Sequence, residues 1–393
     1  MIFSISNKLK QVSSGAFFLL VIAGFVYSSA VKANVIAYKD DFPSKKLDVQ
    51  NLSEQEFIEV SEEFSLILSE NPKLEASIRL PRDWKERQSG KLSKEMSSGI
   101  LQGTIAEFYG PSKFEGTPYL TVDIFQLEKI VSSYHLLKHY LVTGGYSVES
   151  FVPLDWFNAR AVYYTYTDGN SYKVYSQTVL HGMDVVLVSL HAPVSIAKEM
   201  ESLQARVIDS FELQGNVQKA QTLRKYELFT IADFSFFNNW DLKAEDLANE
   251  NRVVVNFERQ KQSQVFTRTQ RDIVHSFIDL KLLKKSAVDT LAREFEVIRK
   301  ASENLGYELG DLIETDTKIT PQPALKFLGL NGYKLEDTIG ERVDNELWVS
   351  VLEGEEYYYL IILNTPSREA GYLRWAHDIA TFRHLVKSIR PKI

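Results

Sequence analysis

Two histidines, His135 and His139, stand four residues apart in a stretch with the pattern of an amphipathic helix. Residues at this spacing lie on one face of a helix, so the two imidazoles could reach the same metal ion. A zinc-protease motif also needs a glutamate beside the first histidine and a third ligand, whereas here Leu136, Leu137 and Lys138 intervene. The spacing is therefore typical of surface histidines, and the sequence predicts no metal site.

The other histidines offer no site either. His181 falls at a predicted hairpin turn and His191 at the end of a predicted strand, where we expect exposed polar side chains. His377, followed by Asp378, and His384 belong to a predicted helix, and they suggest a solvated helix face.

The common catalytic motifs are missing from the sequence. There is no G-x-S-x-G nucleophile elbow, phosphate-binding loop or dinucleotide-binding glycine motif in a fitting context. The chain has no cysteine, which excludes thiol catalysis, C-x-x-C redox chemistry and cysteine zinc sites. Acid pairs such as Glu355-Glu356 are typical of solvated faces in an acidic chain. We therefore expect a protein that is not an enzyme and carries no cofactor.

Aromatic residues are the better candidates for function, because tyrosine and tryptophan are enriched at protein interfaces. In "AVYYTYT", alternation places Tyr164 and Tyr166 on one face of a strand, and "EEYYYLIIL" repeats the pattern. The alternative is packing in the cores of large sheets, since one face of each strand must be buried. The residues predicted to bind a partner protein are Trp156, Phe157, Tyr164, Tyr166, Phe236, Phe237 and Tyr358.

The N-terminus has the features of a secretory signal peptide. Lys8 and Lys10 precede an uncharged apolar run at residues 16–27, and Val31-Lys32-Ala33 offers a cleavage site after Ala33. The run is short for a membrane helix, which needs about 20 residues. The sequence thus predicts an exported protein, periplasmic or secreted, and the alternative is an uncleaved N-terminal membrane anchor.

Charge narrows the range of partners. The chain has 45 Lys and Arg and 52 Asp and Glu, and removing residues 1–33 removes three lysines, which gives 42 − 52 = −10. Such an acidic surface is unsuited to nucleic acid. We expect other envelope or exported proteins as partners, and membrane contact only through an uncleaved N-terminal segment.

A pattern occurs twice along the chain. "LVSLHAPVSIA" at 187–197 and "LIILNTPSREA" at 360–370 each read as a strand, a proline step and a helix start. A hairpin is predicted before each of them, around His181-Gly182 and around Glu353-Gly354. Each repeat is predicted to run through three strands, a helix, three strands and a closing helix.

The earlier elements correspond as well. The predicted strands are 119–127 and 159–167 in the first copy and 273–283 and 324–337 in the second. The predicted helices end at Gly144-Gly145 and at Gly306, and the closing helices follow Pro193 and Pro366. The alternative to two units is a single large domain. The predicted divisions are signal peptide 1–33, polar lead with a short helix 34–73, first domain 74–213, linker 214–225 and second domain 226–393.

This order of elements resembles the PsbP-like superfamily, which includes a lumenal photosystem II accessory protein, a Ran-binding nuclear-transport factor and small bacterial envelope proteins. The residues that carry the resemblance are Trp84, Gly144-Gly145, Pro193 and Ser210-Phe211, and then Trp240, Gly306, Pro366 and Ser388-Ile389. The resemblance implies an α/β/α sandwich around a mainly antiparallel sheet, and members that bind and stabilise other proteins. A tandem pair departs from the usual single domain.

The sequence thus predicts an α+β protein with two tandem α/β/α sandwich domains. We expect an exported, non-catalytic interaction or scaffold module that serves an envelope or secretion-related assembly. The alternative is a small-ligand or metal-binding protein that uses the cleft between the two domains.

Overall fold

The computed structural model describes most of the chain from residue 42 onward. The predicted signal segment and most of the predicted linker lie outside the described residues. No helix in the described ranges is both long and apolar enough to cross a membrane. The described ranges are 42–44, 52–66, 75–87, 95–97, 100–112, 116–127, 130–214, 223–237, 240–247, 252–259, 276–286, 290–304, 307–315, 319–337 and 345–392.

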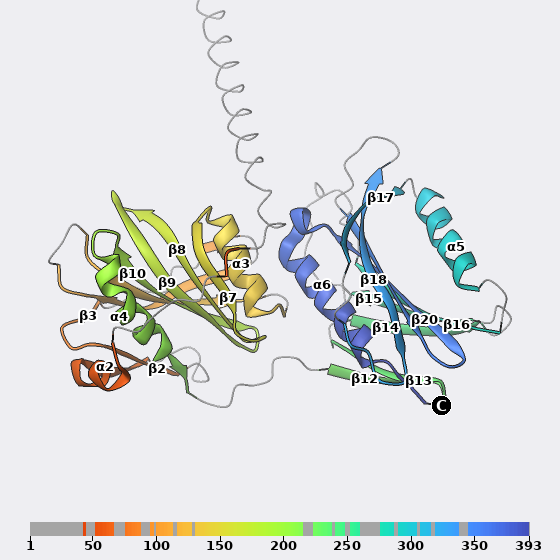
Figure 1. Ribbon diagram of the computed structural model, residues 1–393, viewed down its shortest axis with the longest axis horizontal. Helices are drawn as coiled ribbons and strands as arrows, with labels where there is room; N and C mark the ends of the chain where they lie inside the picture. Colours follow the sequence, from red (N-terminus) through yellow and green to blue (C-terminus); the bar gives the residue numbers. More distant parts are fainter. Residues whose placement is uncertain are drawn as a thin grey trace, which may run out of the picture.

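Two large antiparallel sheets dominate the structure (Figure 1), one in a first half up to residue 214 and one in a second half from residue 223. The strands of the first sheet, in spatial order, are β3 (Lys85–Arg87), β5 (Ile100–Tyr109), β6 (Tyr119–Gln126), β10 (Asp184–Pro193), β9 (Asn170–His181), β8 (Asn158–Thr167) and β7 (Ser147–Pro153), and β4 (Glu95–Ser97) also pairs with β5. Those of the second are β14 (Trp240–Leu247), β15 (Arg252–Arg259), β16 (Phe277–Lys284), β20 (Tyr357–Pro366), β19 (Asn345–Glu353), β18 (Lys326–Asp337) and β17 (Tyr307–Thr315). Position by position, the two orders correspond.

Each half adds a three-stranded antiparallel sheet and helices. The small sheets are β1 (Ser61–Leu66), β2 (Ala76–Pro81) and β11 (Glu212–Leu213), and β12 (Leu223–Leu228), β13 (Ala232–Phe237) and β21 (Arg390–Pro391). The helices are α2 (Glu54–Val60), α3 (Ser133–Thr143), α4 (Ala197–Asp209), α5 (Thr290–Asn304) and α6 (Arg368–Ser388). The predicted α+β class, with antiparallel sheets flanked by helices, is confirmed.

The predicted elements are found with two kinds of difference. Four strands, not three, separate α3 from α4 and α5 from α6, because the edge strands β7 and β17 follow α3 and α5 directly. In addition, β1 lies inside the predicted polar lead and β12 begins inside the predicted linker, and both pair within the small sheets. The predicted capping box at the short helix is confirmed, since Ser53 and Glu56 bond reciprocally at the start of α2.

The closing helices end in the same contact in both halves. The Ser210 hydroxyl accepts from the backbone N–H of Arg79 at 3.0 Å, and the Ser388 hydroxyl accepts from that of Ser235 at 3.0 Å. Each contact joins the end of a closing helix to the middle strand of a small sheet. The serines noted in the sequence are therefore structural groups, which satisfy a backbone donor inside the fold.

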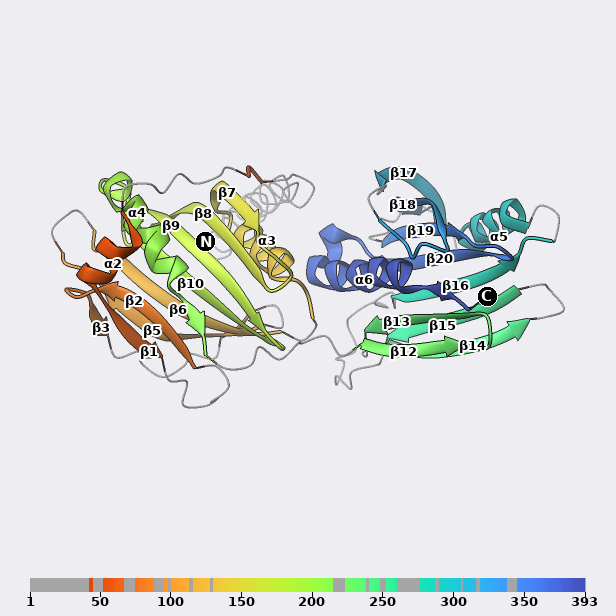
Figure 2. The ribbon, with the colours of Figure 1, turned by 60° about the horizontal axis from the view of Figure 1, so that its bottom comes forward.

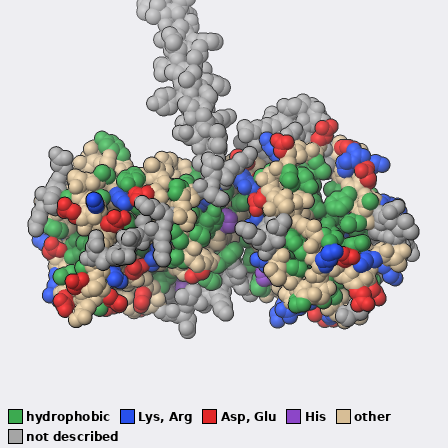
Figure 3. Space-filling model, in the orientation of Figure 1, with side chains coloured by type: hydrophobic (Ala, Val, Ile, Leu, Met, Phe, Trp, Pro, Cys, Tyr) green, Lys and Arg blue, Asp and Glu red, His purple; other side chains and the backbone are tan. Residues whose placement is uncertain are grey.

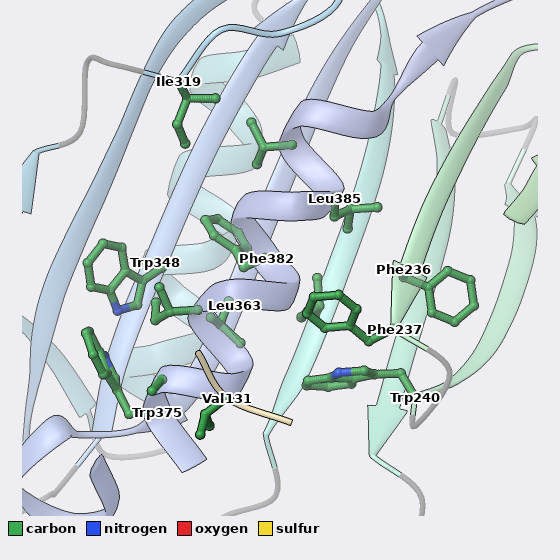
Figure 4. Close-up of a cluster of buried hydrophobic side chains, with 14 of the residues drawn as sticks. Val131, Phe236, Phe237, Trp240, Ile319, Trp348, Leu363, Trp375, Phe382 and Leu385 are labelled. Atoms are coloured by element: carbon green, nitrogen blue, oxygen red, sulfur yellow. The ribbon is translucent and has the colours of Figure 1, made fainter. Parts of the chain in front are cut away.

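The two halves share part of their core. One cluster lies between the first sheet, α4 and the β1–β2 strands. A larger cluster runs from the α3 face of the first sheet to α6 and the second sheet, and Figure 4 shows Val131 of the first half among the side chains around α6. A third lies between the second sheet and α5. Figures 1 and 2 accordingly place α3 and α6 between the two large sheets.

Candidate functional site

The paired histidines of α3 lie against α6. The His135 ring is 5.9 Å from Tyr372 and 6.0 Å from Trp375 between centroids, and His139 stacks on Tyr372 at 6.1 Å. The expectation of surface histidines is therefore wrong. Helical periodicity predicts which face of α3 packs on its own sheet. It cannot predict that α6 of the second half also packs against α3.

Burial changes the acid–base behaviour of both rings. Desolvation, helped by the positive charges of Arg383, Lys138 and Arg368, lowers the pKa of His135 to about 3. Desolvation also lowers the pKa of His139. Both histidines are thus held neutral at the contact between the halves.

The predicted solvated face of the last helix is also wrong, since His377 and Asp378 are fully buried. Nδ1 of His377 donates to the carbonyl of Ile130 at 2.7 Å, a bond between the halves. The Asp378 carboxylate accepts from the hydroxyls of Ser276 at 2.5 Å and Thr365 at 3.0 Å. These polar groups are buried because each has a partner, a condition that helical spacing alone does not reveal.

His181 and His191, which were predicted to be exposed, are also less exposed than expected. His181 is buried at the end of β9, and His191 is half-buried, with its ring stacked on Tyr119 at 4.2 Å. Across the described ranges, no group of three or more His, Asp or Glu side chains is placed to hold a metal ion.

Two of the aromatics predicted to bind a partner are inside the protein. Phe236 and Phe237 are each only 2% exposed. Phe237 instead contacts half-buried Trp156 of the first half, with ring centroids 6.5 Å apart. These phenylalanines therefore cannot form part of a partner surface in this conformation. The sequence pattern missed this because β13 is covered by α6, which comes from the far end of the chain.

The other predicted aromatics differ in exposure. Tyr166 is 73% exposed, and Tyr164 is 38% exposed and donates to Glu149 at 2.7 Å. Phe157 and Tyr358 are half-buried against their sheets. The seven predicted aromatics thus lie on the three strands β8, β13 and β20 and on the loop before β8. Of these, Trp156 and Phe237 are the pair from different elements whose rings are in contact.

A buried carboxylate organises the start of α6. Glu346 on β19 is 1% exposed and accepts from the indole N–H groups of Trp348 at 3.0 Å and Trp375 at 2.7 Å. It also accepts from the backbone N–H and Nε of Arg368, at 3.1 and 3.2 Å. The Arg368 guanidinium lies 4.4 Å from the centre of the Trp375 ring. Four accepted bonds leave this carboxylate no role as a base, so the cluster is structural.

The two large sheets differ at one edge. In the first, the edge strand β7 is covered by residues from the chain's own N-terminal region, since Phe151 N–H donates to the carbonyl of Pro43 at 2.9 Å. The Phe42 ring packs on Phe151 at 5.5 Å, and the ammonium of Lys138 lies 5.9 Å from the Phe42 ring. A short segment of the N-terminal region thus covers this edge through one backbone hydrogen bond and one ring contact.

At the corresponding edge of the second sheet, the described residues add no strand to β17. Leu309 and Leu312 on this strand are 40% and 55% exposed, and Leu328 on neighbouring β18 is 44% exposed. In Figure 3, apolar side chains gather on the face of the second half that carries β17, β18 and α5. This strand was not predicted from the sequence, although the run that follows the predicted helix stop at Gly306 was its signal.

Comparison with known proteins gives similarities of shape only. No protein-family model and no curated protein matches the chain. Among solved structures, the chain is similar to the cyanobacterial PsbP (CyanoP) of Synechocystis sp. PCC 6803, with 13% identity, a TM-score of 0.28, and coverage of 39% of this chain and 92% of that one. It is similar to LpqN of Mycobacterium tuberculosis, which is involved in cell envelope biogenesis, with 11% identity, a TM-score of 0.26, and coverage of 42% and 99%.

A third similarity covers both halves. The type VI secretion immunity protein TplEi of Pseudomonas aeruginosa matches 85% of this chain and 97% of its own length, with 9% identity and a TM-score of 0.21. At these values none of the matches assigns a function to the chain.

Proposed function

We propose that this chain is an exported, non-catalytic protein-interaction module built from two PsbP-like units in tandem, and that it binds its partner at edge strand β17. The N-terminal sequence, with its basic residues, apolar run and cleavage site, supports export. The matching strand orders and the matching serine contacts of the two halves support the tandem arrangement. Partner binding at the envelope is consistent with the acidic charge of the mature chain.

The observation that carries the proposal is the difference between the two edges. An exposed edge strand presents unpaired N–H and C=O groups, which an extended peptide can pair with. In the first half this position is already taken by residues 42–44. The corresponding position beside β17 therefore has the geometry to accept an extended segment from another protein.

The side chains of β17 indicate what kind of segment fits. Leu309 and Leu312 provide apolar contact area, and Glu308 and Asp311 are exposed on the same strand. The two carboxylates oppose pairing of this edge with the same edge of a second copy, because like charges would meet. An extended segment that carries apolar and basic side chains is complementary to this edge.

The alternative of a ligand in a cleft between the two units has less support. Where α3 meets α6, the rings of His135, Tyr372 and Trp375 are in contact, and Trp156 contacts Phe237. Aromatic side chains of the described residues thus meet directly where the two halves touch.

The test is a pull-down of the tagged mature protein from its native envelope after mild crosslinking, followed by titration of the recovered partner. Replacing Leu312 with lysine is expected to weaken binding about tenfold, because burial of a leucine is worth roughly 1.5–3 kcal/mol when complete. Hydrogen exchange of the β17 amides should slow when the partner is bound.

A matched control is Leu154→Lys, which makes the same change at a leucine of the first half that is 49% exposed. It is expected to leave partner binding unchanged. The proposal fails if nothing is recovered above background, or if Leu312→Lys and Leu154→Lys bind the partner equally well.

A further inference from the structure

The end of β8 carries two exposed tyrosines that lie far from β17 in the sheet order of the chain, on the first half. Tyr166 is 73% exposed and Tyr164 is 38% exposed. Val194, which follows β10, is 48% exposed, and its backbone N–H donates to the carbonyl of Ser171 at 2.9 Å. Ser171 pairs directly with Tyr166, so Val194 lies beside the tyrosines. We call Tyr164, Tyr166 and Val194 the Tyr166 surface.

The strand register places these tyrosines on the α4 side of the sheet. Tyr164 pairs directly with Lys173 on β9. Two residues further along β9, the hydroxyl of Tyr175 donates to Glu201 of α4 at 3.0 Å. Because alternate residues of a strand share a face, Lys173, Tyr164 and Tyr166 lie on this same side. Helix α4 packs on β9 and β10, as Figure 2 shows, so the tyrosines of β8 lie beside the helix and stay exposed.

Two carboxylates border the tyrosines and share one lysine. The ammonium of Lys173 lies 3.1 Å from a carboxylate oxygen of Glu149 on β7 and 3.5 Å from one of Glu201. The Glu149 carboxylate also accepts from the Tyr164 hydroxyl at 2.7 Å, a bond that raises the pKa of Tyr164 to about 12. Both glutamate side chains are partly exposed, and a carboxylate has about four acceptor positions, so each can accept further hydrogen bonds.

The charge of this region favours a cationic group. Lys173 balances one of its two glutamate partners, and the exposed neighbours Lys198 and Glu199 at the start of α4 balance each other. One negative charge therefore remains beside the two tyrosine rings. A cation is attracted both to a carboxylate and to the face of an aromatic ring, so the two features select the same kind of group.

The second half closes the corresponding position. The repeated strand and proline step align Ala192 with Thr365, and the residues paired with these two are Lys173 and Glu346. Glu346 is buried beneath Trp375 of α6, whose indole N–H donates to it at 2.7 Å. The fold thus allows a buried cluster at this position. The open cluster of the first half is not a requirement of the fold, which favours recognition as its role.

We propose that the Tyr166 surface, together with Glu149 and Glu201, binds an arginine side chain presented by a partner protein. A guanidinium is planar, so it can stack on a tyrosine ring while its N–H groups donate to carboxylates, and lysine lacks this geometry. A free small cation would leave most of its own area in water on so open a surface. A protein segment also covers Val194, and tyrosine and arginine are both enriched at protein interfaces.

The test measures binding of the peptide acetyl-Gly-Leu-Arg-Leu-Gly amide to the mature protein by ligand-observed NMR. Peptides with lysine or citrulline in place of arginine are compared with it, since citrulline keeps the shape of arginine and removes its charge. We expect the arginine peptide to bind at millimolar concentration, the lysine peptide to bind several-fold more weakly, and the citrulline peptide not to bind. Added salt should weaken the binding of the arginine peptide.

Two variants remove the two parts of the site separately. Tyr166→Ala removes an exposed ring, and Glu201→Gln removes one charge while it keeps an acceptor for the Tyr175 hydroxyl. Each is expected to weaken binding of the arginine peptide about fivefold, with circular dichroism as the check on folding. The matched control is Phe295→Ala, which removes a 42% exposed ring from the second half and should bind the peptide like the wild type.

The proposal is overturned if the arginine peptide does not bind, or if the lysine or citrulline peptide binds equally well. It is also overturned if Tyr166→Ala and Glu201→Gln bind the arginine peptide as tightly as Phe295→Ala does. If Leu312→Lys weakens binding and Tyr166→Ala does not, the peptide binds at β17 instead. That result would contradict the arginine site on the first half and leave the proposed function at β17 standing.

Discussion

Replacing Glu346 with glutamine is expected to reduce the free energy of unfolding of the second half by about 3–5 kcal/mol, the usual cost of breaking a buried ion pair by removing one partner. The Glu346 carboxylate accepts from two indole N–H groups and twice from Arg368. A glutamine at this position has an NH₂ group in place of one carboxylate oxygen. That NH₂ group cannot accept the hydrogen bonds that the replaced oxygen accepts in the wild type. Arg368 is then left buried with only Glu314, at 3.5 Å.

The measurement is urea-induced unfolding followed by tryptophan fluorescence, to which Trp348 and Trp375 contribute as two of the five tryptophans of the chain. Because Arg368 and Trp375 belong to α6, the same variant should also loosen the contact of α6 with α3 and increase the radius of gyration in solution scattering.

Glu353→Gln is the matched control, because it makes the same change on the same strand. Glu353 pairs with Lys285 at 2.8 Å near the surface, where ion pairs contribute little, so this variant should remain close to wild-type stability. If Glu346→Gln is no less stable than Glu353→Gln, the structural role given to the Glu346 cluster is wrong.

Acidification is expected to weaken the contact between the two halves. The pKa of His135 is lowered from an ordinary value near 6.5 to about 3, and the pKa of His139 is also lowered, so the folded contact disfavours the protonated rings. The contribution of His135 is therefore complete above pH 6.5 and is lost as the pH falls from 6.5 toward 3. By pH 4.5, two units below the ordinary pKa, the loss from this ring is about 3 kcal/mol, at roughly 1.4 kcal/mol per pH unit.

The groups that face His135 make the effect stronger. Arg368 and Arg383 approach it from α6 and Lys138 from its own helix, so a proton on the ring would add to a cluster of positive charge. The measurement is solution scattering and thermal unfolding between pH 7.5 and 4.5. Expansion of the particle should accompany the fall in melting temperature.

His135→Leu should flatten this pH dependence, because the variant has no ring to protonate. His191→Phe serves as the control, since His191 has a similarly low pKa but lies away from α6, beside Tyr119. A His135→Leu protein that expands on acidification as much as the wild type would show that His135 does not hold the halves together.

Much of the local architecture followed from the sequence. The alternating aromatic and β-branched runs predicted strands such as β8 and β18, helical spacing predicted α3 and α4, and Ser53 with Glu56 predicted the start of α2. The edge strands β7 and β17 were not predicted from the sequence. An edge strand is partly exposed to solvent, so its residues are only weakly apolar and their periodicity is a weak signal. The proposed partner site at β17 was missed for that reason.

What the sequence by itself determined is the repeated order of short-range elements, because apolar periodicity, caps and proline steps act over a few residues. Only the tertiary structure decided which surfaces remain available. The contact of His377 with Ile130 spans 247 positions of the chain, and it turns apparently solvated histidines into buried ones. The hydroxyls of Tyr163, Ser176 and Ser189 likewise come from three strands whose register is set by pairing, so no local pattern could place them together.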